Sequence, residues 1–185
     1  MIFDELGLPK DNGATDLQDS ARLAGILQIF GWILPIEQYV IVKNGKKIYA
    51  RHPLEDKYDF SRDQAVCLVA GLWKANRIDL VNESYITGKD ILSPSVKGHF
   101  KRCKNQQANW FQNLWLKIDI LWHSYVTPLD EPNQLICMMM VAGSEYIKMW
   151  KKHNKQWEKS ITDYWCGWRN EQYLASEMIK QLDKY

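Results

Sequence analysis

The sequence predicts a mainly α protein: a single-domain antiparallel helical bundle with one small β-hairpin near residues 39–51. Apolar residues recur at helical spacing along most of the chain, and Asn44-Gly45 between two short β-type runs is typical of a two-residue hairpin turn. The connections between the expected helices are short, which favours antiparallel neighbours. We expect six or seven helices, with residues 15–185 forming one domain after an irregular lead-in at residues 1–14.

The first half of that domain should hold two long helices around the hairpin. Residues 15 or 16 to 34 have helical apolar spacing that ends before Pro35, and strands are expected at 39–43 and 47–51. Pro53 then stops the second strand. A further helix starts at Ser61, which forms a capping-box pattern with Gln64, and a short one is expected at 78–86.

The second half should be helical throughout. A basic helix is expected at 96–104, and residues 107–126 form a helix with a broad apolar face that we expect other helices to cover. The residues of this face are Trp110, Phe111, Leu114, Trp115, Ile118, Leu121, Trp122 and Tyr125. A helix from Pro132 is apolar all round at 136–143, which predicts a central position, and its distal half reaches residue 155. Helices at 156–165 and 171–182 follow, with Trp165 and Trp168 as the tryptophans expected to be partly exposed.

Composition narrows the partners and the compartment. With 46% apolar and 25% charged residues the 185-residue chain should fold as one domain, and its formal charge of +2 attracts neither nucleic acid nor anionic lipid. The longest nearly apolar run, residues 23–36, falls short of the roughly 20 residues that span a bilayer, so no membrane contact is expected. Residues 1–7 lack the features of a secretory signal, so export is not expected.

No metal or cofactor motif is present. Four cysteines are widely spaced, which favours reduced thiols over zinc ligands or a disulfide framework. No P-loop, G-x-G-x-x-G or G-x-S-x-G pattern occurs, so most large enzyme classes lack support and no cofactor is expected. Whether the protein is an enzyme stays open.

The first candidate site surrounds the turn Arg51-His52-Pro53. His52 is a candidate catalytic acid or base, together with Asp63 at the start of the next helix. Arg51 and Arg62 are candidate binding residues, because a guanidinium holds a carboxylate or phosphate through two hydrogen bonds. The alternative is that Arg51 and Asp63 pair and pin the hairpin onto the helix.

Three further groups carry a functional and a structural interpretation. Asp19 and Arg22, at i and i+3, form either a surface ion pair or part of a binding cleft. Asp119 and His123, at i and i+4, share a helix face that suits a hydrogen-bonded pair better than a metal site. Lysines at 97–104 and 148–155 indicate solvated helix faces rather than a nucleic-acid surface.

The segments 19–25 (DSARLAG), 51–53 (RHP) and 61–64 (SRDQ) resemble a group of bacteriophage and prophage proteins that are mostly helical and lack an assigned activity. The likeness covers roughly the first 75 residues and implies a protein in the cytoplasm of an infected bacterium, or in the virion. The same order of an Asp-bearing helix, an R-H-P turn and a polar helix start also resembles the opening helices of α/α-toroid carbohydrate-active enzymes.

Three functions follow as hypotheses. The first is a domain that binds or processes a polar small molecule or a sugar near the R-H-P turn, with Arg51, His52, Arg62 and Asp63 converging on it. The second is a non-enzymatic interaction or structural protein of a phage, with an exposed aromatic or basic surface. The third is a weak nucleic-acid binder. None of the sequence patterns predicts the oligomeric state of the protein.

Overall fold

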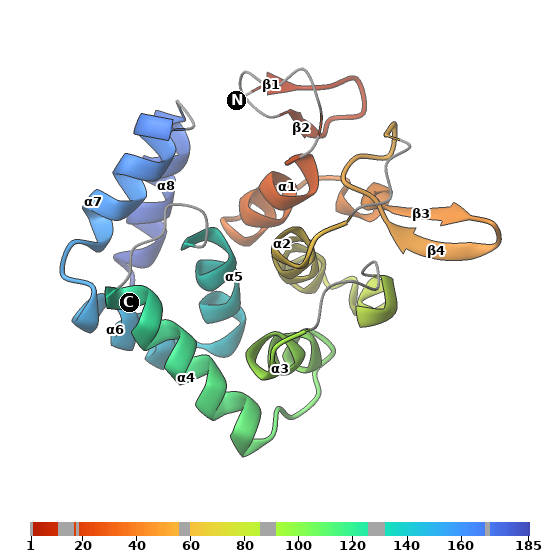
Figure 1. The fold of residues 1–185 in the computed structure, drawn as a ribbon. Coiled ribbons are helices and arrows are strands. Elements are labelled where there is room, and N and C mark those ends of the chain that lie inside the picture. The colour runs from red at the N-terminus through yellow and green to blue at the C-terminus, as the bar shows by residue number, and fades with distance from the viewer. Residues whose placement is uncertain are drawn as a thin grey trace.

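The computed structural model describes residues 2–10, 17, 19–55, 60–85, 92–125, 132–168 and 171–185. It confirms the predicted fold class, because the described part holds eight α-helices and two small antiparallel two-stranded sheets (Figure 1). The helices are α1 (Ser20–Ile29), α2 (Arg62–Lys74), α3 (Pro94–Cys103), α4 (Trp110–Tyr125), α5 (Pro132–Ala142), α6 (Ser144–His153), α7 (Trp157–Thr162) and α8 (Gln172–Leu182). None of the described helices is long and apolar enough to cross a bilayer.

The predicted hairpin is confirmed. Strand β3 (Val40–Lys43) pairs with β4 (Lys46–Tyr49), and Lys43 lies opposite Lys46 across the two-residue turn. Asn44 and Gly45 adopt φ of 49° and 72°, the left-handed pair that a type I′ turn requires. A 3-10 turn, η1 (Ile36–Tyr39), leads into this hairpin, which projects from the helical body (Figure 1).

The expectation of an irregular lead-in is wrong for residues 2–10. Strands β1 (Ile2–Phe3) and β2 (Pro9–Lys10) form a second small antiparallel sheet. Its loop is ordered by Asp4, whose Oδ1 accepts the backbone N–H groups of Leu6 and Leu8 at 2.9 and 2.8 Å. Residues 11–16, including the predicted helix start at 15 or 16, lie outside the described residues.

Helix α1 is shorter than expected at its end. Gly31 adopts φ of 97°, and the amides of Gly31 and Trp32 donate to the carbonyls of Gln28 and Leu27. This is the Schellman pattern that terminates a helix at glycine. Ile33, expected on the buried stripe, is therefore beyond the helix and 96% exposed.

Three other element predictions need correction. Ser61 is the N-cap of α2, but its side chain makes no capping hydrogen bond, so the capping box is not formed. The short helix expected at 78–86 is two 3-10 turns, η2 (Ile78–Leu80) and η3 (Glu83–Tyr85). The long helix expected through residue 155 divides into α5 and α6 at Gly143, where φ is 117°.

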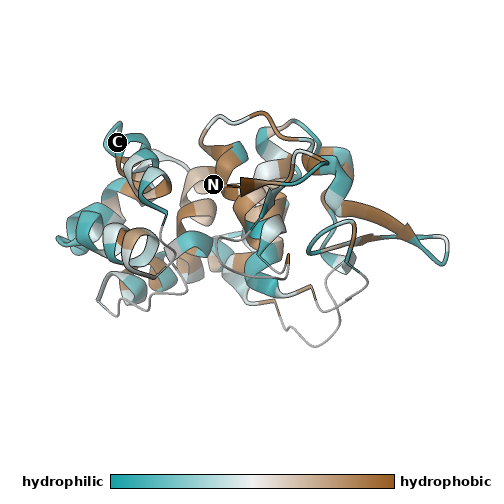
Figure 2. Ribbon diagram, turned by 90° about the horizontal axis from the view of Figure 1, so that it is seen from above, coloured by the Kyte–Doolittle hydropathy of each residue, from teal (hydrophilic) through white to brown (hydrophobic). Residues whose placement is uncertain are grey.

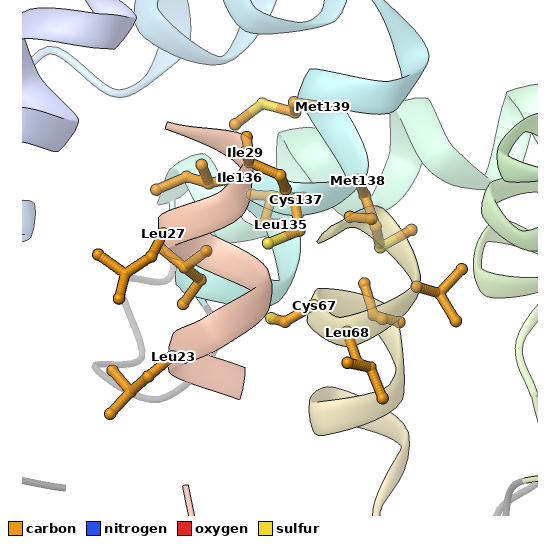
Figure 3. Close-up of a cluster of buried hydrophobic side chains, with 14 of the residues drawn as sticks. Leu23, Leu27, Ile29, Cys67, Leu68, Leu135, Ile136, Cys137, Met138 and Met139 are labelled. Atoms are coloured by element: carbon orange, nitrogen blue, oxygen red, sulfur yellow. The ribbon is translucent and has the colours of Figure 1, made fainter. Parts of the chain in front are cut away.

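The core lies between α1, α2 and α5. Helices α1 and α2 approach closely at Gly25, where a side chain would collide with the backbone carbonyl of Cys67. Figure 3 shows Cys67 of α2 and Cys137 of α5 directed into this shared space beside α1. Of the all-round apolar segment at 136–143, residues 136–139 are buried and residues 140–143 are partly buried. Hydrophobic helix segments occupy the middle of the molecule (Figure 2).

The aromatic predictions are largely wrong. The face of α4 expected to be covered is exposed, with Trp110, Trp122 and Tyr125 between 63% and 75% accessible. Trp165, expected at the surface, is buried instead within the π-helical turn η4 (Asp163–Trp168). The side chain of Trp168 lies outside the described residues. Helix α4 therefore buries one narrow face, at Gln112, Leu116, Ile120 and Ser124, and leaves a wide apolar one open.

Candidate functional site

His52 is fully buried and held at both ring nitrogens. Its Nδ1 accepts the backbone N–H of Leu54 at 3.2 Å, so the hydrogen of the neutral ring is on Nε2. That Nε2 donates to Oδ2 of Asp4 at 2.7 Å, and the ring of Tyr39 packs edge-on against the imidazole. No ring nitrogen is left to exchange a proton with a ligand.

Asp4 completes a hydrogen-bonded cluster that connects the N-terminal sheet, the start of α1, the η1 turn and the R-H-P turn. Desolvation by itself would raise the pKa of Asp4, but the Leu8 amide, His52 and the Leu6 amide together hold that pKa below its ordinary value of 3.8. Next to it the hydroxyl groups of Tyr39 and Ser20 are 2.6 Å apart, and burial raises the pKa of Tyr39 above its ordinary value. The R-H-P turn thus joins the N-terminal sheet, the start of α1 and the hairpin.

Asp19, Arg22 and Asp63 meet where α1 and α2 begin. The Arg22 guanidinium donates to Asp19 Oδ2 at 2.6 Å and to Asp63 Oδ2 at 3.4 Å. Arg22 is buried and Asp63 is partly exposed, so the group is a bridge between two helix starts with one side open to solvent. The ion pair expected for Asp19 and Arg22 is therefore present, although Arg22 is buried and not on the surface.

The six predicted site residues make separate contacts in the described part of the chain: His52 pairs with Asp4, and Arg22 bridges Asp19 and Asp63. The backbone carbonyl of Arg51 accepts the Ala21 amide at 3.0 Å, which fixes the turn against α1. Arg62 lines a cavity. The catalytic roles of His52 and Asp63, and the binding roles of Arg51, Asp19 and Arg22, stay predictions.

The cavity beside Arg62 has a volume of about 150 Å³ and receives side chains from helices α2, α4 and α5 and from Ser93, the residue before α3. Its lining residues are Arg62, Ser93, Asp119, His123, Gln134, Leu135 and Met138. The Nε–H group of Arg62 is buried and meets no acceptor among the described residues. A buried donor of a charged group without a partner is costly. A ligand in the cavity would meet the other N–H groups of the guanidinium, because Nε itself is closed to solvent.

Two of the lining residues, Ser93 and Asp119, are joined by a hydrogen-bonded chain through Ser95. The Ser95 hydroxyl donates to Oδ2 of Asp119, so the Ser93 hydroxyl, 2.8 Å from Ser95 Oγ, donates to Ser95. Ser93 is also the N-cap of α3 and accepts the Val96 amide at 3.4 Å. The Ser95 hydroxyl thus stabilises the Asp119 carboxylate through a charge-assisted hydrogen bond.

His123 stands one helical turn from Asp119. Its Nδ1 is 2.6 Å from the Asp119 carbonyl oxygen, which can only accept, so Nδ1 carries the hydrogen of the neutral ring. Nε2 is then the acceptor nitrogen. Within the described ranges, no group of three His, Cys, Asp or Glu side chains is placed to hold a metal ion.

Three helices begin at this cavity. Arg62 is the first residue of α2, Ser93 caps α3, and Gln134 lies in the first turn of α5. The partial positive charge of a helix N-terminus attracts anions, and here it adds to the charge of Arg62. The first turn of α5 also holds Asn133, whose buried amide has no partner in the described part of the chain.

Ser93, Ser95 and Gln134 were not identified from the sequence as site residues. Ser93-Pro94-Ser95 is a helix-start pattern, and its serines serve the cap and the Asp119 chain together. Asp119 in an otherwise apolar helix was the available signal, because a carboxylate there needs a partner. The hydrogen-bond partner of Asp119, Ser95, lies 24 positions earlier in the chain, and no local sequence pattern indicates that pairing.

Two other hollows are more open. One of about 420 Å³ lies beside the N-terminal sheet and is lined by Phe3, Asp4, Glu5, Lys10, Leu17 and Leu54. The other, of about 550 Å³, lies between α7 and α8. Neither is lined by an arginine, and in neither do several helix N-termini meet.

No protein-family model matches the chain, and comparisons with curated proteins and with solved structures also gave no match.

Proposed function

We propose that this protein binds a small polar ligand with an anionic group, a phosphate or a carboxylate, in the cavity beside Arg62. The observation that carries the proposal is that Arg62 lines a cavity at which three helices begin. Arginine and helix N-termini are the two groups that proteins most often offer to such anions.

The cavity suits a small ligand. A volume of about 150 Å³ accommodates a molecule of roughly benzene size, such as inorganic phosphate or a short carboxylic acid. Because the cavity is open to solvent on one side, a larger ligand would extend out of it. Asp119 and Ser93, which also line the cavity, favour a ligand that carries a hydroxyl group, since a carboxylate accepts a hydrogen bond from it.

The ligand-binding role is tested by isothermal titration of inorganic phosphate and malonate into the protein. Arg62→Ala should weaken binding about tenfold or more, because a charge-assisted hydrogen bond contributes about 1.5–3 kcal/mol. Arg77→Ala is the matched control, since Arg77 lies on the surface and pairs only with Asp79 among the described residues. Equal affinity of the Arg62→Ala variant and the wild type would refute the site.

A second candidate function is a non-enzymatic interaction or structural role. It is supported by the wide apolar face of α4, which a protein that acts alone has no reason to expose. The likeness of three N-terminal segments to phage proteins supports a place for either role in the cytoplasm of an infected bacterium or in the virion.

A nucleic-acid role is the weakest of the three. Two of the basic residues that it needs are engaged elsewhere: Arg102 donates to Asn113 and lies over the Tyr146 ring, and Lys151 lies over the Trp157 ring. Binding of DNA or RNA that weakens steeply with salt would support this role.

A further inference from the structure

The outer face of α4 carries seven exposed apolar residues in one continuous stripe. They are Trp110, Phe111, Leu114, Trp115, Ile118, Trp122 and Tyr125, each between 37% and 75% accessible. At 100° per residue the stripe is about 140° wide. Lys117, the charged residue nearest to the stripe on α4, falls at its edge. A helix that is apolar on nearly every side is normally buried.

The size of this stripe matches one half of a stable interface. With about 200 Å² as the whole surface of a large apolar side chain, the seven residues leave roughly 750 Å² uncovered. The largest apolar patch of a typical monomer is about 300–600 Å². A standard interface between two proteins covers about 800 Å² on each partner.

The spacing within the stripe indicates what covers it. Phe111, Trp115, Ile118, Trp122 and Tyr125 follow one another at intervals of four, three, four and three residues. This is the repeat by which one helix packs along another. The aromatic rings also contact one another. Phe111 makes edge-on contacts with Trp110 and Trp115, with ring centroids 5.9 and 6.2 Å apart. Because these contacts already restrict the side chains, less conformational entropy is lost on binding.

We propose that a second copy of this chain covers the stripe, with α4 packed against α4 in a symmetric homodimer. A symmetric interface brings the same patch from both subunits together, so it must carry no charge that repels its own copy. An uncharged stripe rich in tryptophan and tyrosine meets that condition and has the composition of an interface centre. Dimerisation is independent of ligand binding, because Asp119 and His123 leave α4 on its other side toward the Arg62 cavity.

Sedimentation equilibrium of the purified full chain tests the proposal. The wild type should have twice the 21.8 kDa mass of the chain, with a Kd of about 10 µM or tighter. Trp122→Glu and Ile118→Glu should each produce a monomer that keeps its helical circular dichroism, since both positions are exposed. Ile33→Glu, at an exposed apolar residue away from α4, should stay dimeric.

Cross-linking gives a second measurement. Ile118 lies at the middle of α4, so two copies meet there whichever way the helices run. Ile118→Cys should form a covalent dimer under mild oxidation, whereas the wild type and Val42→Cys should not. A wild type that is monomeric at every concentration would overturn the proposal, as would a monomer that binds neutral lipid vesicles through α4. Phosphate titration of the same samples reports separately on the Arg62 cavity.

Discussion

Both ring nitrogens of His52 form hydrogen bonds within the protein, and these bonds bear on the role of the R-H-P turn. A histidine that serves as an acid or base keeps one nitrogen for the reacting group, while the other is oriented by a partner. Here the Leu54 amide and Asp4 take one nitrogen each. These two hydrogen bonds tie the turn to the N-terminal sheet and should stabilise the N-terminal half.

Replacing His52 should destabilise the protein without affecting the Arg62 cavity. His52→Ala leaves the buried Asp4 carboxylate without its imidazole partner, and we expect the free energy of unfolding to fall by about 3 kcal/mol. Urea denaturation measures the change. In the double variant with Asp4→Asn the loss should be smaller than the sum of the two single losses. Additive losses would mean that the pair is not coupled.

His99 makes stability depend on pH. Burial lowers the pKa of His99 from 6.5 to about 4, the hydrogen bond to the Val66 carbonyl opposes this shift, and nearby Arg102 adds to it. Because the unfolded chain takes up the proton first, stability is complete above pH 6.5 and falls as the pH drops toward 4. The loss should reach about 3 kcal/mol, at about 1.4 kcal/mol per pH unit.

Urea denaturation between pH 7 and pH 4 checks this. His99→Gln keeps a donor for the Val66 carbonyl but cannot be protonated, so it should remove most of the pH dependence in that window. A variant with the same pH profile as the wild type would assign the acid sensitivity to other groups. Below pH 3.8, protonation of Asp4 adds a separate loss, because its folded pKa is lowered.

Glycines decide several element boundaries, and they explain where the sequence predicted the elements well and where it did not. Asn44-Gly45 is a local signal, so the hairpin was predicted correctly. Gly31 and Gly143 stand inside apolar runs, where helical periodicity continues through them and conceals the break. The Ser61–Gln64 pattern was present without its hydrogen bond, because a motif states what side chains can do and tertiary contacts decide what they do.

The contact between α1 and α2 should not tolerate a methyl group at Gly25. Gly25→Ala would push its Cβ into the Cys67 carbonyl, which is backbone and cannot move aside, so we expect a loss of about 3 kcal/mol. Thermal unfolding measures it. Gly167→Ala, with nothing within 4 Å of the added Cβ, is the control and should change stability little. Equal stability of the two variants would show that α1 and α2 can separate.

At the scale of the whole molecule, the sequence predicted the fold class and the buried α5 but not which faces are covered. Helix α4 is apolar on several sides, and periodicity alone does not indicate which side meets the core. For a similar reason, the sequence patterns placed the residues of the Arg62 cavity in separate candidate groups. Arg62 and Asp119 were both noted as candidates, yet their common cavity depends on how α2 packs near α4 and α5, which no spacing within one helix encodes.

A titration of inorganic phosphate followed by backbone amide NMR tests most directly whether the binding site is the Arg62 cavity. We expect the largest shifts at Arg62, Ser93, His123 and Gln134, and we expect Arg62→Ala to need about tenfold more phosphate to reach the same shifts at the other three. Amides of Asp4 and Leu54, beside the R-H-P turn, should stay unchanged. Shifts centred on Asp4 and Leu54, or no saturable shifts at all, would contradict the account.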